Sequence, residues 1–220
     1  MKPGWLRLLA TAVLVVAAAM LLRPVAVSAA SEVSPAGSAS GRGVVVLLRG
    51  GLLDRGVNLS VGMNEMGDVL QSAGIEARVI HHTHWTETTD EIVRRYAVRP
   101  LHVVLVGHSF GANAAVAMAA KLQTRRIPVD LVVTFDPTVE LHVPRNVAYA
   151  INFGTVIGTT LPLRGGAGFH GRIDNVLVEG SNHFTVDSAP EAQARIIREV
   201  TRILAAPTVP AGSAASSATP

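Results

Sequence analysis

The chain has 220 residues, of which 49% are hydrophobic and 16% charged, and it contains no cysteine. The absence of cysteine excludes disulfides and lipid attachment through a thioether. Its formal net charge of +3 comes from Lys2, Arg7 and Arg23, because beyond residue 30 the basic and acidic residues balance at 16 each. The high pI therefore gives no indication of nucleic-acid binding, and we expect none.

The first 30 residues have the pattern of a secretory signal peptide. Lys2 and Arg7 precede an apolar run over residues 8–22, and small residues follow at 27–30. The run has 15 residues, fewer than the ~20 that span a bilayer. The sequence therefore predicts an exported protein, periplasmic or secreted, with no stable membrane insertion after signal removal. An uncleaved amino-terminal anchor is the alternative.

The remaining chain divides into three parts by composition. Residues 31–42 are small and mostly uncharged, and they predict a linker. Residues 206–220 contain no charge and no hydrophobic periodicity, which predicts a disordered tail. One folded domain at 43–205 is left, large enough for its own core.

Strand and helix patterns alternate along the folded domain. Apolar, β-branched runs predict six strands, at 44–48, 75–80, 101–106, 129–135, 146–153 and 173–178. Helical patterns lie at 61–73, 89–97 (with Thr88 or Thr89 as its cap), 112–122 and 189–204. The glycine-rich residues 154–171 predict a loop that is either mobile or covers the substrate. The alternation predicts an α/β fold, a mostly parallel six-stranded sheet with helices on both faces and no inserted cap domain.

The most specific motif is Gly107-His108-Ser109-Phe110-Gly111, between a predicted strand and a predicted helix. The two glycines allow a turn so tight that the residues two before and two after the serine need almost no side chain. Such a turn strains the serine backbone and exposes the hydroxyl at the carboxyl end of the sheet. We therefore predict that Ser109 is a nucleophile. The alternative is a plain turn in which Ser109 only caps the helix.

A base and an acid follow at the ends of later strands. Asp136 comes directly after the strand at 129–135, and His183 lies between the last strand and the last helix. A nucleophilic serine needs a base for its proton and a carboxylate to orient that base. His170 is the alternative base, and the alternative acids are Asp174, Glu179 and Asp187.

With this motif and this order of Ser, acid and His, the chain resembles the α/β-hydrolase superfamily over about residues 44–204. Within that superfamily it looks most like lipases, esterases and thioesterases. The resemblance implies an oxyanion hole made by the amides of Phe110 and of Gly51 or Leu52, after the first strand. Many members carry the acid one strand later than Asp136, but no Asp or Glu occurs between residues 141 and 173.

We therefore expect a serine hydrolase that cleaves ester or thioester bonds of a small-molecule acyl substrate, with no cofactor and no metal. An acyltransferase with the same triad and a non-catalytic binding protein are the alternatives. His81, His82 and His84 follow the second strand and raise a third possibility, a metal-dependent hydrolase. No carboxylate or cysteine at a zinc-like spacing accompanies them, so we interpret them as solvated loop histidines or part of the active-site rim.

Overall fold

The protein is described from a computed structural model that covers residues 42–51, 59–156 and 161–208. The predicted signal peptide, the predicted linker before residue 42 and the predicted tail beyond residue 208 lie outside these residues, as does Leu52. Within the described residues, no helix is at once long enough and apolar enough to cross a membrane.

Six parallel strands form the central sheet of the described chain, in the order β2-β1-β3-β4-β6-β8. Their bounds are Gly43–Arg49 for β1, Ala77–His81 for β2, His102–His108 for β3, Val129–Phe135 for β4, Val147–Gly154 for β6 and Arg172–Leu177 for β8. The order reverses between β1 and β3, because β2 lies on one side of this pair and every later strand on the other. Ligand sites of parallel sheets lie at the carboxyl ends of strands, next to such a reversal.

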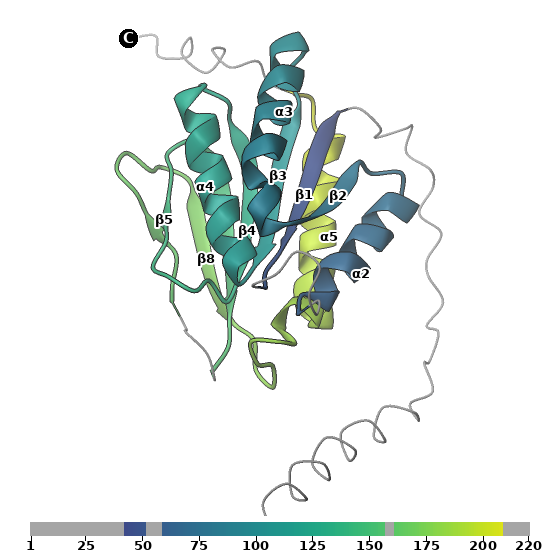
Figure 1. Cartoon of the computed structure of the whole chain (residues 1–220), viewed down its shortest axis with the longest axis vertical. Coiled ribbons are helices and arrows are strands. Elements are labelled where there is room, and N and C mark those ends of the chain that lie inside the picture. The colour runs from purple at the N-terminus through teal and green to yellow at the C-terminus, as the bar shows by residue number, and fades with distance from the viewer. Residues whose placement is uncertain (1–41, 52–58, 157–160, 209–220) are drawn as a thin grey trace, which may run out of the picture. The chain divides into compact units, whose positions relative to one another are not determined.

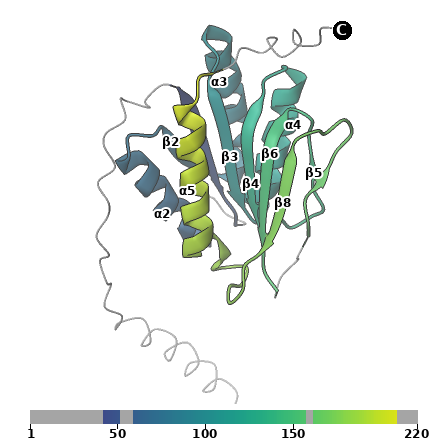
Figure 2. The ribbon, with the colours of Figure 1, turned by 180° about the vertical axis from the view of Figure 1, so that it is seen from behind.

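Helices cover both faces of the sheet, as predicted (Figures 1 and 2). Helices α2 (Val61–Ser72) and α5 (Pro190–Ala205) lie on one face, and α3 (Trp85–Val98) and α4 (Phe110–Thr124) lie on the other. Successive side chains of a strand point to opposite faces, so Leu47 packs with the core under α2 and Leu48 with the core under α4. Burial of one such side chain stabilises the fold by roughly 1.5–3 kcal/mol.

Helix α3 begins four residues earlier than the sequence predicts, directly after the short 3-10 helix η1 (His82–His84). The predicted capping role of Thr88 and Thr89 is wrong. The Thr88 hydroxyl donates to the His84 carbonyl at 2.9 Å, and the Thr89 hydroxyl donates to the Trp85 carbonyl at 2.6 Å. Each hydroxyl bonds back by one turn, which is how a threonine inside a helix satisfies its donor.

The glycine-rich loop contains structure that the sequence does not predict. Its short strand β7 (Arg164–Gly165) pairs in parallel with β5 (His142–Val143), which lies between β4 and β6 in the chain. Leu163 is buried in the core on the α4 side, and Phe169 packs against that core. The described part of the loop is therefore held by core packing, and residues 157–160 lie outside the described residues.

Candidate active site

A single residue, Ser109, joins β3 to α4. Its backbone has φ 59° and ψ −123°, a conformation that a residue with a side chain rarely adopts. A Cβ on Gly107 would clash with the Gly111 carbonyl, and a Cβ on Gly111 would clash with the Leu48 carbonyl in β1. The predicted tight, strained turn is therefore confirmed, and both glycines are required by close backbone contacts.

This turn lies at the carboxyl ends of β1 and β3, where the strand order reverses. A strained serine between a parallel strand and a helix, in a sheet covered on both faces, has the geometry of a nucleophile elbow. The chain has an α/β-hydrolase-like fold. The elbow of such a fold exposes its serine to residues from the loops that follow neighbouring strands.

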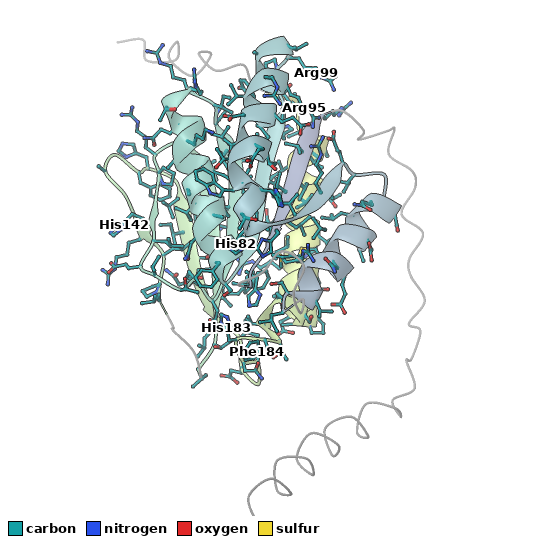
Figure 3. The ribbon with its side chains drawn as sticks, in the orientation of Figure 1. His82, Arg95, Arg99, His142, His183 and Phe184 are labelled. Atoms are coloured by element: carbon teal, nitrogen blue, oxygen red, sulfur yellow. The ribbon has the colours of Figure 1, made fainter. Side chains whose placement is uncertain are left out.

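His183 is brought to Ser109 by the loop between β8 and the short 3-10 helix η2 (Val186–Ser188). Its Nε2 lies 3.1 Å from Ser109 Oγ, within hydrogen-bond distance. Ser109 is buried, at 8% exposed, and the His183 side chain is about one quarter exposed. Figure 3 shows His183 and Phe184 together at one end of the sheet, with Arg95 and Arg99 at the other end.

Asp136 follows β4 and is buried beside His183. Its Oδ2 lies 3.4 Å from His183 Nδ1, so the imidazole stands between Ser109 and a carboxylate. Asp136 has φ 40°, a left-handed conformation that turns the chain sharply at the end of the strand. The main-chain amide of Asp136 donates to the Phe153 carbonyl at 3.0 Å, which continues the pairing with β6.

Thr155 is a partner of this carboxylate that the sequence analysis missed. Its amide donates to Asp136 Oδ1 at 3.0 Å, and its hydroxyl donates to Asp136 Oδ2 at 2.8 Å. Thr155 directly follows β6, the neighbour of β4 in the sheet. A short hydroxyl residue at a strand end, in the slot where many members of the superfamily carry the acid, is the signal that could have identified it.

The alternative acids and the alternative base have other surroundings. Asp174 accepts hydrogen bonds from Tyr149 at 2.7 Å and from Arg172 at 2.9 Å, and it also pairs with Arg195. The hydrogen bonds from Arg172, Tyr149 and Arg195 lower its pKa to about 2. Asp187 accepts from the Met63 amide at 3.3 Å, and burial raises its pKa to about 6.

Glu179 and His170 are both exposed. His170 precedes β8 and so belongs to the amino end of that strand, opposite the end that carries Ser109. Among the predicted site residues, the structure thus brings Ser109, His183 and Asp136 together.

Backbone amides after β1 and at the start of α4 are the candidates for an oxyanion hole. Phe110 is the first residue of α4, and the first amides of a helix have no acceptor within the helix. Gly50 donates its amide to Ser60 Oγ at 3.0 Å, so that amide is already used. Gly51 has φ 108°, a backbone conformation that favours glycine. Its amide remains a candidate for the oxyanion hole, and Leu52 lies outside the described residues.

Of the three histidines at the end of β2 and in η1, His84 is exposed as predicted, and His81 and His82 are not. His81 is buried, and its Nδ1 lies 2.9 Å from Thr83 Oγ1. The His82 ring stacks on Phe110, with 5.5 Å between ring centroids, so it belongs to the rim around Ser109. Over the described ranges, no three His, Cys, Asp or Glu side chains are grouped so that they could hold a metal ion.

No protein-family model matches the chain, and no curated protein matches it in sequence. Among solved structures, it is similar to YbtT, the type II thioesterase of the yersiniabactin biosynthetic pathway, at 10% identity and a TM-score of 0.49. That match covers 77% of this chain and 98% of YbtT. It is also similar to a protein of unknown function from Agrobacterium tumefaciens assigned to the α/β hydrolases. The identity is 11% and the TM-score 0.48, with 74% of this chain and 87% of the other covered.

Proposed function

We propose that the chain is a serine hydrolase that cleaves carboxylic ester or thioester bonds of small acyl substrates. One observation carries the proposal. Ser109 Oγ, the His183 imidazole and the Asp136 carboxylate lie in series, at 3.1 Å and 3.4 Å. A hydroxyl, a base and a buried carboxylate in this order are the parts that acyl transfer through a serine needs.

In the first half of the reaction, His183 Nε2 takes the proton from Ser109 Oγ as the oxygen attacks the carbonyl carbon of the substrate. The carbonyl oxygen becomes an oxyanion, held by the amides of Phe110 and of Gly51 or Leu52. One such donor contributes about 3 kcal/mol to transition-state stabilisation in comparable sites. His183 then gives its proton to the departing alcohol or thiol, which leaves the acyl group on Ser109.

In the second half, His183 takes a proton from water, and the resulting hydroxide attacks the acyl-serine. The acid is released, and the proton returns to Ser109 Oγ. Asp136 stabilises the imidazolium that forms in each half and holds Nδ1–H toward itself. Its two hydrogen bonds from Thr155 keep the carboxylate in one orientation.

Exposed apolar side chains beside the site favour an apolar acyl group. Phe110 follows Ser109, and Phe184 follows His183, and both are exposed to solvent. Val156 follows Thr155 and is exposed as well. Exposed apolar residues that gather around polar reactive groups are typical of a binding surface for an apolar ligand. We therefore propose that the acyl chain lies against Phe110 and Phe184.

Labelling with a serine-reactive phosphonate tests the nucleophile. The wild-type chain is expected to be labelled at Ser109 and to hydrolyse p-nitrophenyl esters, and Ser109→Ala to lose both properties. Ser72→Ala, which changes an exposed serine at the end of α2, is the matched control and should behave as wild type. Labelling that persists in Ser109→Ala would overturn the assignment of the nucleophile.

We also propose that the protein is exported, on the pattern of residues 1–30. The mass of the protein recovered from expressing cells tests this proposal. Cleavage of a signal peptide predicts a mature chain that starts near residue 31. A full-length chain in the membrane fraction would instead support the amino-terminal anchor.

A further inference from the structure

His108, the residue before Ser109, is fully buried, and both of its ring nitrogens have partners. Nδ1 lies 2.8 Å from Ser60 Oγ, and Nε2 lies 2.6 Å from the main-chain carbonyl oxygen of His183. Its ring centroid is 4.9 Å from that of His183. None of these contacts takes part in the mechanism above, yet they join the residue before the nucleophile to the loop that carries the base.

The partners determine the protonation of the ring. A carbonyl oxygen only accepts hydrogen bonds, so Nε2 of His108 carries a proton and donates it to His183. Burial lowers the pKa of His108 to about 4, so the ring is neutral at pH 7. Nδ1 of the neutral ring is therefore an acceptor, and the Ser60 hydroxyl donates to it.

The chain of hydrogen bonds continues to the candidate oxyanion loop. Ser60 Oγ accepts the amide hydrogen of Gly50, at 3.0 Å. Gly50 lies between the end of β1 and Gly51, and a Cβ on Gly50 would lie 2.7 Å from both the His108 carbonyl oxygen and Ser109 Cβ. One line of donors and acceptors thus runs from the loop after β1, through the elbow, to the loop after β8.

We propose that His108 is a positioning residue that holds the His183 loop, and with it the imidazole of His183, at its distance from Ser109. This inference rests on the proposed function. Hydrogen bonds within residues 182–186 close the turn that carries His183, among them the Phe184 amide to Asn182 Oδ1 at 2.9 Å and the Val186 amide to the Asn182 carbonyl at 3.0 Å. These bonds shape the turn, and they do not reach the strand end that carries Ser109. The hydrogen bond from His108 ties the main chain of His183 to the same strand end that carries the nucleophile.

The neutral state of His108 is part of this role. His183 becomes an imidazolium in each half of the reaction, and a second cation 4.9 Å away would oppose that charge. A neutral ring supplies the N–H donor without the opposing charge. A lysine or arginine could donate to the same carbonyl only as a buried cation.

Two substitutions separate the two ends of the His108 ring. Gln has its amide nitrogen as many bonds from Cβ as the imidazole Nε2, so His108→Gln keeps a donor to the His183 carbonyl. Asn has its amide oxygen at the level of Nδ1, so His108→Asn keeps the contact with Ser60 and loses the one with His183. We expect kcat on a p-nitrophenyl ester to fall roughly tenfold in His108→Asn with KM little changed, and to stay within about threefold of wild type in His108→Gln.

Wild-type kcat in His108→Asn, or equal losses in the two variants, would overturn the inference. Phosphonate labelling of the same samples distinguishes this outcome from a failure of the proposed function. If the proposed function is wrong, labelling does not depend on Ser109; if only the inference on His108 is wrong, it does. If neither variant folds, the wild-type chain still gives a test. With histidine labelled by ¹⁵N in the ring and ¹³C at the carbonyl, NMR should show an Nε2–H coupled across a hydrogen bond to a histidine carbonyl and unchanged between pH 5 and 8. Absence of this coupling would overturn the inference by itself.

Discussion

Thr155 donates two hydrogen bonds to the Asp136 carboxylate, one from its amide at 3.0 Å and one from its hydroxyl at 2.8 Å. Both residues are buried, and they lie at the ends of the adjacent strands β4 and β6. The carboxylate oxygen that accepts from the hydroxyl is also the one that lies 3.4 Å from His183 Nδ1. In the proposed mechanism, Thr155 therefore helps to orient the base through the Asp136 carboxylate.

Removal of the Thr155 hydroxyl should slow turnover without removing the acid. Thr155→Val keeps the shape of the side chain and the hydrogen bond from the main-chain amide to Asp136 Oδ1. Only the hydrogen bond from the hydroxyl to Oδ2 is lost. We expect kcat/KM to fall roughly tenfold, which corresponds to about 1.4 kcal/mol of transition-state stabilisation. Thr155→Ser, which retains a hydroxyl, should recover most of the rate, and equal rates in both variants would contradict the role.

Asp136→Asn tests which carboxylate stands behind His183. In a triad of this kind the amide favours the wrong imidazole tautomer, and the expected loss of kcat is on the order of 10³–10⁴-fold. Asp174→Asn is the matched control, because Asp174 pairs with Arg172 and Arg195 instead. It should lower stability and leave kcat unchanged. The assignment fails if the two variants lose comparable activity.

Phe184→Ala tests whether the acyl chain lies against the exposed ring beside His183. The KM for esters with longer acyl chains should rise several-fold, while kinetics on an acetate ester should change little, because a short acyl group does not reach the ring. Val98→Ala is the control, since Val98 is 86% exposed at the far end of α3. A uniform loss over all chain lengths would point to damage of the His183 loop instead.

The stability of the wild-type chain should respond to pH through His108. Burial lowers its folded-state pKa from 6.5 to about 4, with the buried Asp187 carboxylate 4.0 Å from Nδ1 and the His183 ring 4.9 Å from the His108 ring, so the unfolded chain binds a proton more readily. The stability that His108 contributes is present above pH 6.5 and is lost as the pH falls towards 4. Relative to His108→Gln, the wild-type free energy of unfolding should decrease by about 3 kcal/mol between pH 7 and pH 4. Urea titrations of the two chains check this, and parallel pH profiles would contradict it.

Several features of the fold could be predicted because their causes are local. The apolar run at 129–135 has the same bounds as strand β4. The glycines at 107 and 111 predict the tight turn from their spacing around Ser109, without any long-range contact. The start of α3 could not be predicted from Thr88 and Thr89. Threonine is a common helix cap, but the hydroxyls of both residues donate to carbonyl oxygens one turn earlier. The helix therefore already runs through both residues, directly after η1.

The sequence by itself determined the position of the serine, the order of strands and helices and the few candidates for the base and the acid, since these depend on residue spacing and on alternating apolar runs. The tertiary structure decided which candidates meet. Strand order brings the carboxyl ends of β3, β4 and β8 to one edge of the sheet, so that His183 lies beside Asp136. Asp174 instead pairs with arginines. Ser60 and the ring of His108 gain their roles only from contacts between distant segments, and no local pattern encodes such contacts. The position of Thr155 at a strand end is a local signal, but its pairing with Asp136 depends on the neighbouring strand.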